Sequence, residues 1–458
     1  MTAINDAWVA VGGTPALLPR LTAVVREDTL PSTLPVRELA RACAGACALA
    51  AAELGARRAG LAEVPAVTVD DGAVAAAFHS ERLVRVDGRT PDVFAPLSRF
   101  WRTADGWLRT HANYPHHRAR LTAALGLPAD ASVAEVAGRL AERSAPEAEE
   151  AVQAAGGLAV ALRTPREWQA HPQAAEVAAR PLVERARLDA APARVLPALD
   201  PAAAPLLPAA GLRVLDLTRV LAGPVATRTL ALLGADVLRL DAPWLPELPD
   251  QHADTGIGKR SAALDLDSGR ETFEELLDTA DVVVTGYRPG ALDRFGLAPR
   301  ALAERHPGLV VAQVSAWGAY GPWGGRRGFD SLVQVATGIA VAEGAAERPG
   351  ALPAQALDHG TGYLLAAAVL RALTEQSYDG GSRLVRAALA RTAHWLTHGI
   401  RPAPGEGAPY PGPDAWLTET DSALGRLRHV RPAVSFAGGP TAWRRPPVPW
   451  GSDTATWL

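Results

Sequence analysis

The stretch that decides the fold class of this chain is GLRVLDLTRVLAGPVATRTLALLGADVLRLDAP, residues 211–243. Its apolar run at 214–217 is typical of a buried parallel strand. Ala222-Gly223-Pro224 then predicts a turn into a helix, because glycine permits close backbone approach and proline fits the first helical turn. Gly234 ends that helix, and 235–240 predicts the next strand. The first turn of such a βαβ unit is where α/β folds bind coenzymes, but no G-x-G-x-x-G is present, which argues against a standard NAD site.

The same alternation continues through residues 211–400. Strands are predicted at 213–217, 236–240, 262–266, 281–285 and 309–315, and helices at 224–233, 268–279, 298–305, 330–338 and 360–375. Strands that alternate with helices predict an α/β fold, a doubly wound parallel sheet in a large Rossmann-like domain.

The rest of the chain divides by composition. Residues 83–188 predict a smaller α+β domain, placed N-terminal to the large one, with a β-hairpin that turns near Asp105-Gly106. An Ala/Pro-rich linker follows at 189–210, and a C-terminal tail at 401–458 is expected to pack on the large domain. The N-terminal segment, residues 1–82, predicts a helix at 36–57 and strands at 67–69 and 73–78.

Composition excludes several classes of function. The chain has 458 residues, 48% hydrophobic and 21% charged, with a net charge of −3, so it has no electrostatic footprint for nucleic acid or an anionic membrane. We expect no membrane span and no signal peptide, and hence a cytoplasmic protein. Cys43 and Cys47 are expected to be packing residues in a reducing compartment.

Three clusters could carry chemistry. Asp358, in QALDHGTG, follows a Pro/Gly-rich loop and precedes an apolar helix, so it is either a catalytic carboxylate or a helix cap. The turn that contains Tyr287 and Arg294 could stack on a purine and clamp phosphates, or be a solvated loop. Arg326-Arg327-Gly328-Phe329-Asp330 is a cluster of the same type. The histidines of HANYPHHR, residues 111–118, lack metal-ligand spacing, so we expect no zinc site.

One basic residue stands apart from the others. Of 46 Lys+Arg, only Lys259 is lysine. Lysine offers a compact, mobile charge where arginine offers a planar fork. A functional role and a solvated loop position are both open for Lys259.

Six pieces of the sequence, in order, resemble the family III CoA-transferases, the superfamily of formyl-CoA transferase, carnitine CoA-transferase and α-methylacyl-CoA racemase. The pieces are VLDLTRVLAGPVATRTLALLGADVLRLDAP, GKRSAALDL, ADVVVTGYRPGALDRFGL, VSAWGAYGP, GFDSLVQVATG and LDHGTGYLLAAAVLRAL. The resemblance covers residues 211–400. The segments at 97–121 and 164–173 are similar to the small domain of the family, which normally follows the large one, so the domain order is permuted or a truncated tandem.

The resemblance implies an acyl-CoA:carboxylate CoA-transferase with Asp358 as nucleophile, working through an aspartyl mixed anhydride and an aspartyl-CoA thioester. Coenzyme A and acyl-CoA are then substrates, no cofactor is bound permanently, a carboxylic acid is the acceptor, and a homodimer is expected. The residues that match the CoA-binding positions are Val220, Leu221, Ala222, Lys259, Tyr287, Arg294 and Arg327.

Two alternatives stay open. One is a CoA-thioester racemase, isomerase or lyase; the racemase branch has a histidine before the aspartate where this chain has Phe329-Asp330, which favours transfer. The other is a non-catalytic CoA-binding or partner subunit. Residues 38–80 also share an element order with 361–400, so residues 1–82 are interpreted as a possible remnant of a second large domain.

Overall fold

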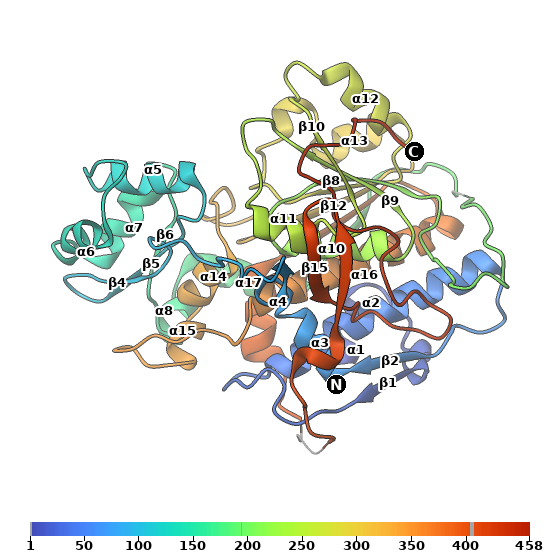
Figure 1. The fold of residues 1–458 in the computed structure, drawn as a ribbon, viewed down its shortest axis with the longest axis horizontal. Helices are drawn as coiled ribbons and strands as arrows, with labels where there is room; N and C mark the ends of the chain where they lie inside the picture. The colour runs from blue at the N-terminus through green and yellow to red at the C-terminus, as the bar shows by residue number, and fades with distance from the viewer. Residues whose placement is uncertain (1, 194, 404–406) are drawn as a thin grey trace.

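A seven-stranded sheet forms the centre of the computed structural model, which describes residues 2–193, 195–403 and 407–458 (Figure 1). Residue 194 of the predicted linker and residues 404–406 of the predicted tail lie outside the described residues. Across the sheet the strand order is β10-β9-β8-β11-β12-β13-β7. The strands are β7 (Glu184–Arg187), β8 (Arg213–Leu217), β9 (Asp236–Asp241), β10 (Arg260–Ala263), β11 (Val282–Thr285), β12 (Val310–Ser315) and β13 (Arg383–Ala388).

This order confirms the predicted fold class. Numbered along the chain from β8, the six parallel strands run 3-2-1-4-5-6, the doubly wound arrangement of Rossmann folds. The seventh strand, β7, pairs antiparallel with β13 at one edge. The order reverses between β8 and β11, and in open α/β sheets ligands bind at the carboxyl ends of the strands at this switch point.

Helices cover both faces of the sheet. Val283 packs with α12 (Arg270–Asp278) and α13 (Pro299–Arg305) in one apolar cluster. Its neighbours Val282 and Val284 point to the other face, toward α10 (Ala222–Leu232) and α16 (Ala356–Asp379). The strands are therefore buried on both sides, which explains their continuous apolar runs.

A smaller lobe lies at one end of the molecule (Figure 1). It contains the three-stranded sheet β4-β5-β6 and the helices α5, α6 and α7, with an apolar core of its own. The predicted hairpin is present in it. Its elements are β4 (Phe100–Arg102), β5 (Trp107–Thr110), α5 (Pro115–Ala124), α6 (Val133–Ala141), α7 (Ala145–Ala154) and β6 (Ala159–Ala161).

The remaining elements surround these two bodies. The first 86 residues hold α1 (Ala3–Ala10), η1 (Pro15–Arg20), β1 (Leu21–Val24), α2 (Val36–Ala59), β2 (Val67–Asp70), α3 (Asp71–Ala77), α4 (Ser80–Leu83) and β3 (Arg85–Val86). The others are α8 (Pro165–Gln169), α9 (Pro172–Ala178), α11 (Pro249–Thr255), η2 (Asp293–Phe295), α14 (Asp330–Ala336), α15 (Ile339–Ala342), α17 (Leu389–His394), η3 (Trp395–Gly399), η4 (Pro413–Trp416), β14 (Leu417–Ser422) and β15 (Gly425–Val430).

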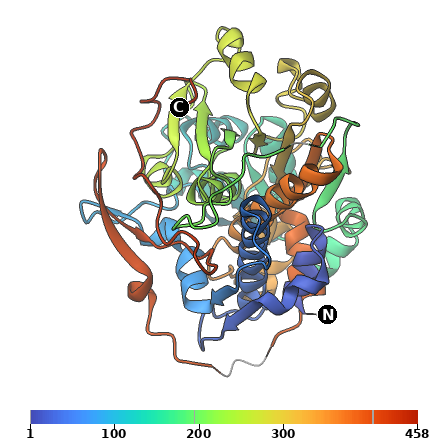
Figure 2. The ribbon, with the colours of Figure 1, turned by 90° about the vertical axis from the view of Figure 1, so that its right-hand side faces the viewer.

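Helix α2 packs along α16, and the two run parallel (Figure 2). Gly360 faces Cys43 in the first half of both helices, Arg371 pairs with Glu53 at 2.5 Å, and Arg57 donates to the carbonyl of Ser377 near their last turns. Although no membrane span was expected, α2 is long and apolar enough to cross a membrane; 89% of that apolar stretch is buried inside the protein. It is the core helix of the N-terminal segment.

Three sequence predictions of local structure were wrong. Residues 73–78 lie mostly in helix α3 rather than a strand, because the side chain of Asp70 accepts the N–H of Gly72 and starts a helix in an alanine-rich stretch. Strand β10 ends at Ala263, since Asp265 accepts the N–H of Asp267 and forms a turn. Helix α16 begins at Ala356 instead of residue 360, which places Asp358 inside its first turn.

Gly362 is expected to be needed for the close packing of α16 on α10. A Cβ at this position would lie 2.5 Å from the carbonyl oxygen of Ala222 and 2.9 Å from Val225 Cβ. Gly362→Ala should therefore lower the free energy of unfolding by about 1–3 kcal/mol, despite the better helix propensity of alanine. Urea denaturation measures this change.

Gly138 in α6 provides the matched control, because a Cβ there would have no neighbour within 4 Å. Gly138→Ala should leave stability unchanged or raise it by up to about 1 kcal/mol. Equal effects of the two substitutions would contradict the packing argument.

Candidate active site

A cavity of about 410 Å³ opens at the carboxyl ends of the parallel strands, where the strand order reverses. The loops after β8, β9, β11, β12 and β13 form one wall, and α5 of the smaller lobe forms the opposite wall. The residues that line it are Tyr114, His116, His117, Arg120, Arg219, Val220, Leu221, Ala222, Gly223, Trp244, Leu245, Gly286, Tyr287, Arg288, Val314, Ser315, Ala316, Arg326, Arg327, Gly328, Phe329, Asp358 and Leu389.

Asp358 lies in this cavity wall from the first turn of α16, and only 6% of the residue is exposed. Burial, together with the negative charges of Asp330 and Glu81, raises the pKa of Asp358 well above its usual range. Asp358 is not the helix cap considered above, since the N-cap position belongs to Gln355. A desolvated carboxyl group that faces a cavity is a common feature of catalytic sites.

Asp330, the first residue of α14, fixes the start of α16. Its Oδ2 accepts the backbone N–H groups of Leu357 at 2.9 Å and Asp358 at 3.0 Å. Its Oδ1 accepts the side-chain amide of Gln334. Asp330 is 1% exposed, and burial raises its pKa despite these hydrogen bonds. The two aspartates are therefore held beside each other in a site that disfavours two negative charges.

The loop after β8 carries backbone strain at the cavity. Val220 has φ 69°, a left-handed conformation that β-branched residues rarely adopt and that costs about 1–3 kcal/mol. Its N–H donates to Glu247 Oε2 at 3.1 Å. The surrounding structure holds Val220 in this conformation at the cavity wall.

Glu247 joins the two lobes beneath the cavity. Its carboxylate accepts the hydroxyl of Tyr114 from the smaller lobe and pairs with Arg239 at 2.9 Å in the large sheet. Although burial alone would raise it, the charges of Arg239 and Arg219 lower the pKa of Glu247 to about 2. The anion therefore persists at neutral pH and fixes the wall that Tyr114 supplies.

Three arginines around the cavity have no carboxylate partner among the residues that the structure describes: Arg120, Arg288 and Arg327. Burial and the charges of Arg120 and Arg288 lower the pKa of Arg327, because the three cations repel one another. Arg326 differs, since it pairs with Glu149 and Glu150. Unpaired guanidinium groups at a cavity suit phosphate or carboxylate ligands.

The histidines of the smaller lobe surround Phe329. His111 stacks on its ring with centroids 3.9 Å apart, and His117 lies 5.9 Å from it. Burial lowers the pKa of His111 to about 3 and, with the neighbouring His116, that of His117 to about 2. Burial also lowers the pKa of His116, so at neutral pH His116 and His117 present neutral rings to the cavity.

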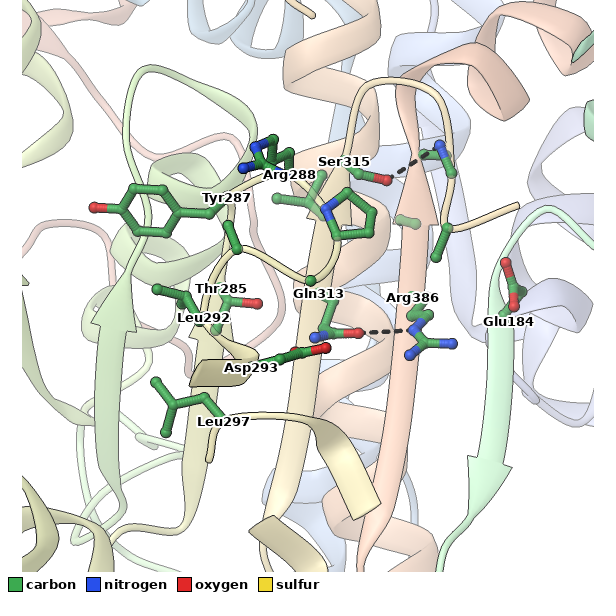
Figure 3. A pocket seen from close by; sticks show the side chains of 18 residues that line it. Glu184, Thr285, Tyr287, Arg288, Leu292, Asp293, Leu297, Gln313, Ser315 and Arg386 are labelled. Atoms are coloured by element: carbon green, nitrogen blue, oxygen red, sulfur yellow. Dashed lines mark hydrogen bonds between the residues drawn. The ribbon is translucent and has the colours of Figure 1, made fainter. Parts of the chain in front are cut away.

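A second, smaller pocket of about 40 Å³ adjoins the cavity, and the two share the wall formed by Tyr287, Arg288 and Ser315 (Figure 3). Within it, Arg386 donates to Gln313 at 2.7 Å. The loop after β11 thus separates two hollows at the same edge of the sheet.

The cavity brings together six of the eight residues predicted from the sequence: Val220, Leu221, Ala222, Tyr287, Arg327 and Asp358. Lys259 lies elsewhere: it is 1% exposed, its Nζ donates to Asp216 at 2.8 Å, and burial lowers its pKa to about 8. Arg294 also lies outside the cavity lining; its side chain is 64% exposed and pairs with Asp267. For these two, contact with CoA stays a prediction that the cavity geometry does not support.

Sequence reasoning missed the roles of Asp330, Glu247, His117 and Arg120. Asp330 and the histidines stood in clusters that the sequence analysis considered, but nothing local showed that Asp330 contacts Asp358 and that the histidines contact Phe329. Within the described ranges, no group of three histidine, cysteine or acidic residues could hold a metal ion.

Asp358→Asn is expected to stabilise the protein at neutral pH. The raised pKa means that the folded state binds a proton more tightly than the unfolded state, so the acid costs stability once pH rises above its unfolded value near 3.8. The gain should be absent below pH 3.8 and grow by about 1.4 kcal/mol for each pH unit up to the folded pKa. Urea denaturation between pH 4 and 8 measures it.

An exposed carboxylate serves as the control for this experiment. Asp267→Asn should change stability by less than about 0.5 kcal/mol at every pH, because its side chain is 57% exposed. A loss of stability in Asp358→Asn at neutral pH would contradict the desolvation of Asp358.

The sequence of this chain is similar to a known protein family and to several characterised or named proteins. Residues 209–401 match the model of CoA-transferase family III. The probable fatty acyl-CoA transferase Rv3272 of Mycobacterium tuberculosis is 34% identical over 240 residues, 47% of this chain and 60% of the relative. The formyl-CoA:oxalate CoA-transferase of Streptomyces coelicolor is 35% identical over 193 residues, 39% of this chain and 47% of the relative.

The match is partial in length. The chain spans about half the length of these curated relatives, and a crystal structure of Rv3272 aligns over 42% of this chain and 57% of that one, with 34% identity and a TM-score of 0.39. The matched region contains β8 to β13 and Asp358. Residues 209–401 thus match CoA-transferase family III by sequence, which confirms for this region the resemblance inferred above.

Proposed function

We propose that this chain is an acyl-CoA:carboxylate CoA-transferase in which Asp358 is the nucleophile. One observation carries the proposal: a desolvated carboxyl group lies in the wall of a 410 Å³ cavity at the switch point of a Rossmann-like sheet. The family match of residues 209–401 supports CoA thioesters as the substrates.

The first half of the reaction moves CoA onto the enzyme. The Asp358 carboxylate attacks the thioester carbonyl, the C–S bond breaks, and the CoA thiolate leaves. The acyl group is then joined to Asp358 as a mixed anhydride. The thiolate then attacks the aspartyl carbonyl of the anhydride. The donor acid departs as its carboxylate, and Asp358 carries CoA as a thioester.

The second half repeats these steps in reverse order with the acceptor. The acceptor carboxylate attacks the aspartyl thioester and releases thiolate, which then attacks the acceptor carbonyl of the new anhydride and frees the Asp358 carboxylate. Each attack forms an oxyanion. The first N–H groups of α10 at Ala222 and Gly223, in the cavity wall, are our candidates to stabilise it.

The remaining walls suit the other parts of CoA. Arg120, Arg288 and Arg327 lack carboxylate partners in the described part of the chain and are proposed to bind phosphates. The strained loop at Val220, with Leu221 and Ala222, is proposed to line the adenine, and Tyr287 to contact the nucleotide.

A purely structural Asp358 is disfavoured by its surroundings. If Asp358 were buried against an arginine and no cleft lay beside it, the structure would favour a non-catalytic subunit. Among the described residues, however, Asp358 has no ion pair, and it lines the cavity. We therefore place catalysis above passive CoA binding.

Asp358→Asn should abolish CoA transfer while CoA still binds. Asparagine fills the same space but cannot form the anhydride, so the rate of transfer should fall by about 10³-fold or more. The dissociation constant of CoA, measured by calorimetry, should change by less than about threefold. Mass spectrometry after incubation with acyl-CoAs and hydroxylamine should detect modification of Asp358 in the unsubstituted chain only; transfer at an undiminished rate in the variant would refute the mechanism.

One observation supports a second candidate, racemisation of an acyl-CoA. The racemase branch has a histidine at the position of Phe329, and here His117 brings a neutral imidazole beside that ring. Its low pKa makes it a weak proton acceptor, so transfer is proposed first. Incubation with a chiral 2-methylacyl-CoA in D₂O distinguishes the two reactions. Racemisation is supported if the unsubstituted chain incorporates deuterium at C2 and neither His117→Gln nor Asp358→Asn does. It is excluded if the unsubstituted chain incorporates no deuterium at C2.

A homodimer and a cytoplasmic location are further proposals. Because α2 covers a face of α16, a second copy would have to bind at another surface. Light scattering after size-exclusion chromatography measures the assembly.

A further inference from the structure

Residues 78–82 of the N-terminal segment contact the back of the active-site helix. Glu81 Oε2 lies 3.0 Å from Nε2 of His359, the residue that follows Asp358. The ring of Phe78 stacks on that imidazole with centroids 5.2 Å apart. His359 is fully buried, and Glu81 is 5% exposed. Asp358 thus faces the cavity while its neighbour is held from behind by residues of another segment.

Residues 79–82, at helix α4, are themselves held by several hydrogen bonds to other parts of the structure. Ser80 Oγ donates to Asp254 at 2.8 Å and accepts from Arg228, which pairs with Asp254 at 2.8 Å. His79 Nε2 and an N–H of Arg82 both contact the carbonyl oxygen of Pro353, at 3.0 and 2.8 Å. Glu81 is therefore fixed both to the large sheet's helices and to the loop that leads into α16.

The charges around Glu81 keep it ionised. Burial alone would raise its pKa, but His359 and then Arg82, 3.6 Å away, lower it below the usual range. A hydrogen bond to an ionised carboxylate requires a proton on Nε2 of His359. The other charged groups that face this region are Asp330 from α14, Arg228 from α10 and Asp254 from α11.

We propose that Glu81 is a positioning residue for the transfer reaction: through Nε2 of His359 it fixes the first turn of α16. The buried carboxylate of Glu81 also disfavours a second negative charge on Asp358, the neighbour of the histidine that it contacts. This inference rests on the proposed function for its kinetic consequence alone. It gives the N-terminal segment, which lies outside the family match at 209–401, a part in the active site.

Two substitutions separate the hydrogen bond from the charge. Glu81→Gln keeps an acceptor for Nε2–H but removes the charge, so the acidic limb of the pH profile of kcat should move to lower pH while the maximal rate stays within about threefold. Glu81→Ala removes both, so kcat should fall by about tenfold or more with KM for acyl-CoA within about twofold, because a small displacement of a reacting group is costly.

Asp71→Asn is the matched control. Asp71 is a buried carboxylate of the same segment, 2% exposed and paired with Arg41 at 2.5 Å, and it is not in the cavity wall. This variant should lose stability without any move in the pH profile. An equal move in Asp71→Asn, or none in Glu81→Gln, would overturn the proposal.

A measurement without substrate distinguishes this inference from the proposed function. Carbon-13 NMR of aspartate-labelled protein follows the titration of Asp358, assigned by comparison with Asp358→Asn. The titration should move to lower pH in Glu81→Gln even if no transfer is ever observed; an unmoved titration would overturn the inference whatever the activity. If the Glu81 variants do not fold, nitrogen-15 NMR of histidine in the unsubstituted chain decides, since His359 must carry its proton on Nε2.

Discussion

The geometry of the candidate active site depends on the hydrogen bonds that the carboxylate of Asp330 accepts. By accepting the N–H groups of Leu357 and Asp358 it starts α16 at a fixed place, and so determines where Asp358 meets the cavity. A helix start needs acceptors for its free N–H groups, and here the acceptor comes from another helix instead of the preceding residue. These two hydrogen bonds fix the start of α16 relative to the first residue of α14.

The position of Asp330 beside Asp358 makes it costly for both aspartates to be charged, and this suits the proposed role of Asp358 as a nucleophile. Asp330 is a good acceptor because it is charged, yet its charge and that of Glu81 oppose ionisation of Asp358 in the same desolvated region. A carboxyl group with a raised pKa is a more basic nucleophile once ionised. The strained backbone at Val220 and the repulsion of Arg327 by Arg120 and Arg288 occur in the same cavity. Both lower the stability of the fold, and such destabilising features are common at functional sites.

The sequence was informative wherever one segment contained the whole signal. The apolar run, the glycine turn and the helix at 211–243 predicted β8, α10 and β9, and the motif around Asp358 predicted a residue of the cavity wall. It failed where a role depends on distant residues. Glu81 lies 278 positions from His359, and Lys259 is withdrawn from the cavity by its pairing with Asp216 inside the sheet. Neither partner follows from local pattern.

The pairing of α2 with α16 explains how the N-terminal segment can reach the active site at all. Both helices have 24 residues, and small side chains let them run side by side: a Cβ on Gly360 would be only 3.4 Å from Cys43 Sγ. Each is followed by a parallel-paired strand and, without a loop, a short helix: β2 and α3 in one case, β13 and α17 in the other. This shared order is consistent with the predicted repeat. Because α3 leads directly into α4, the register of α2 on α16 also carries Phe78 and Glu81 to His359, so that residues of the N-terminal segment pack behind the first turn of α16.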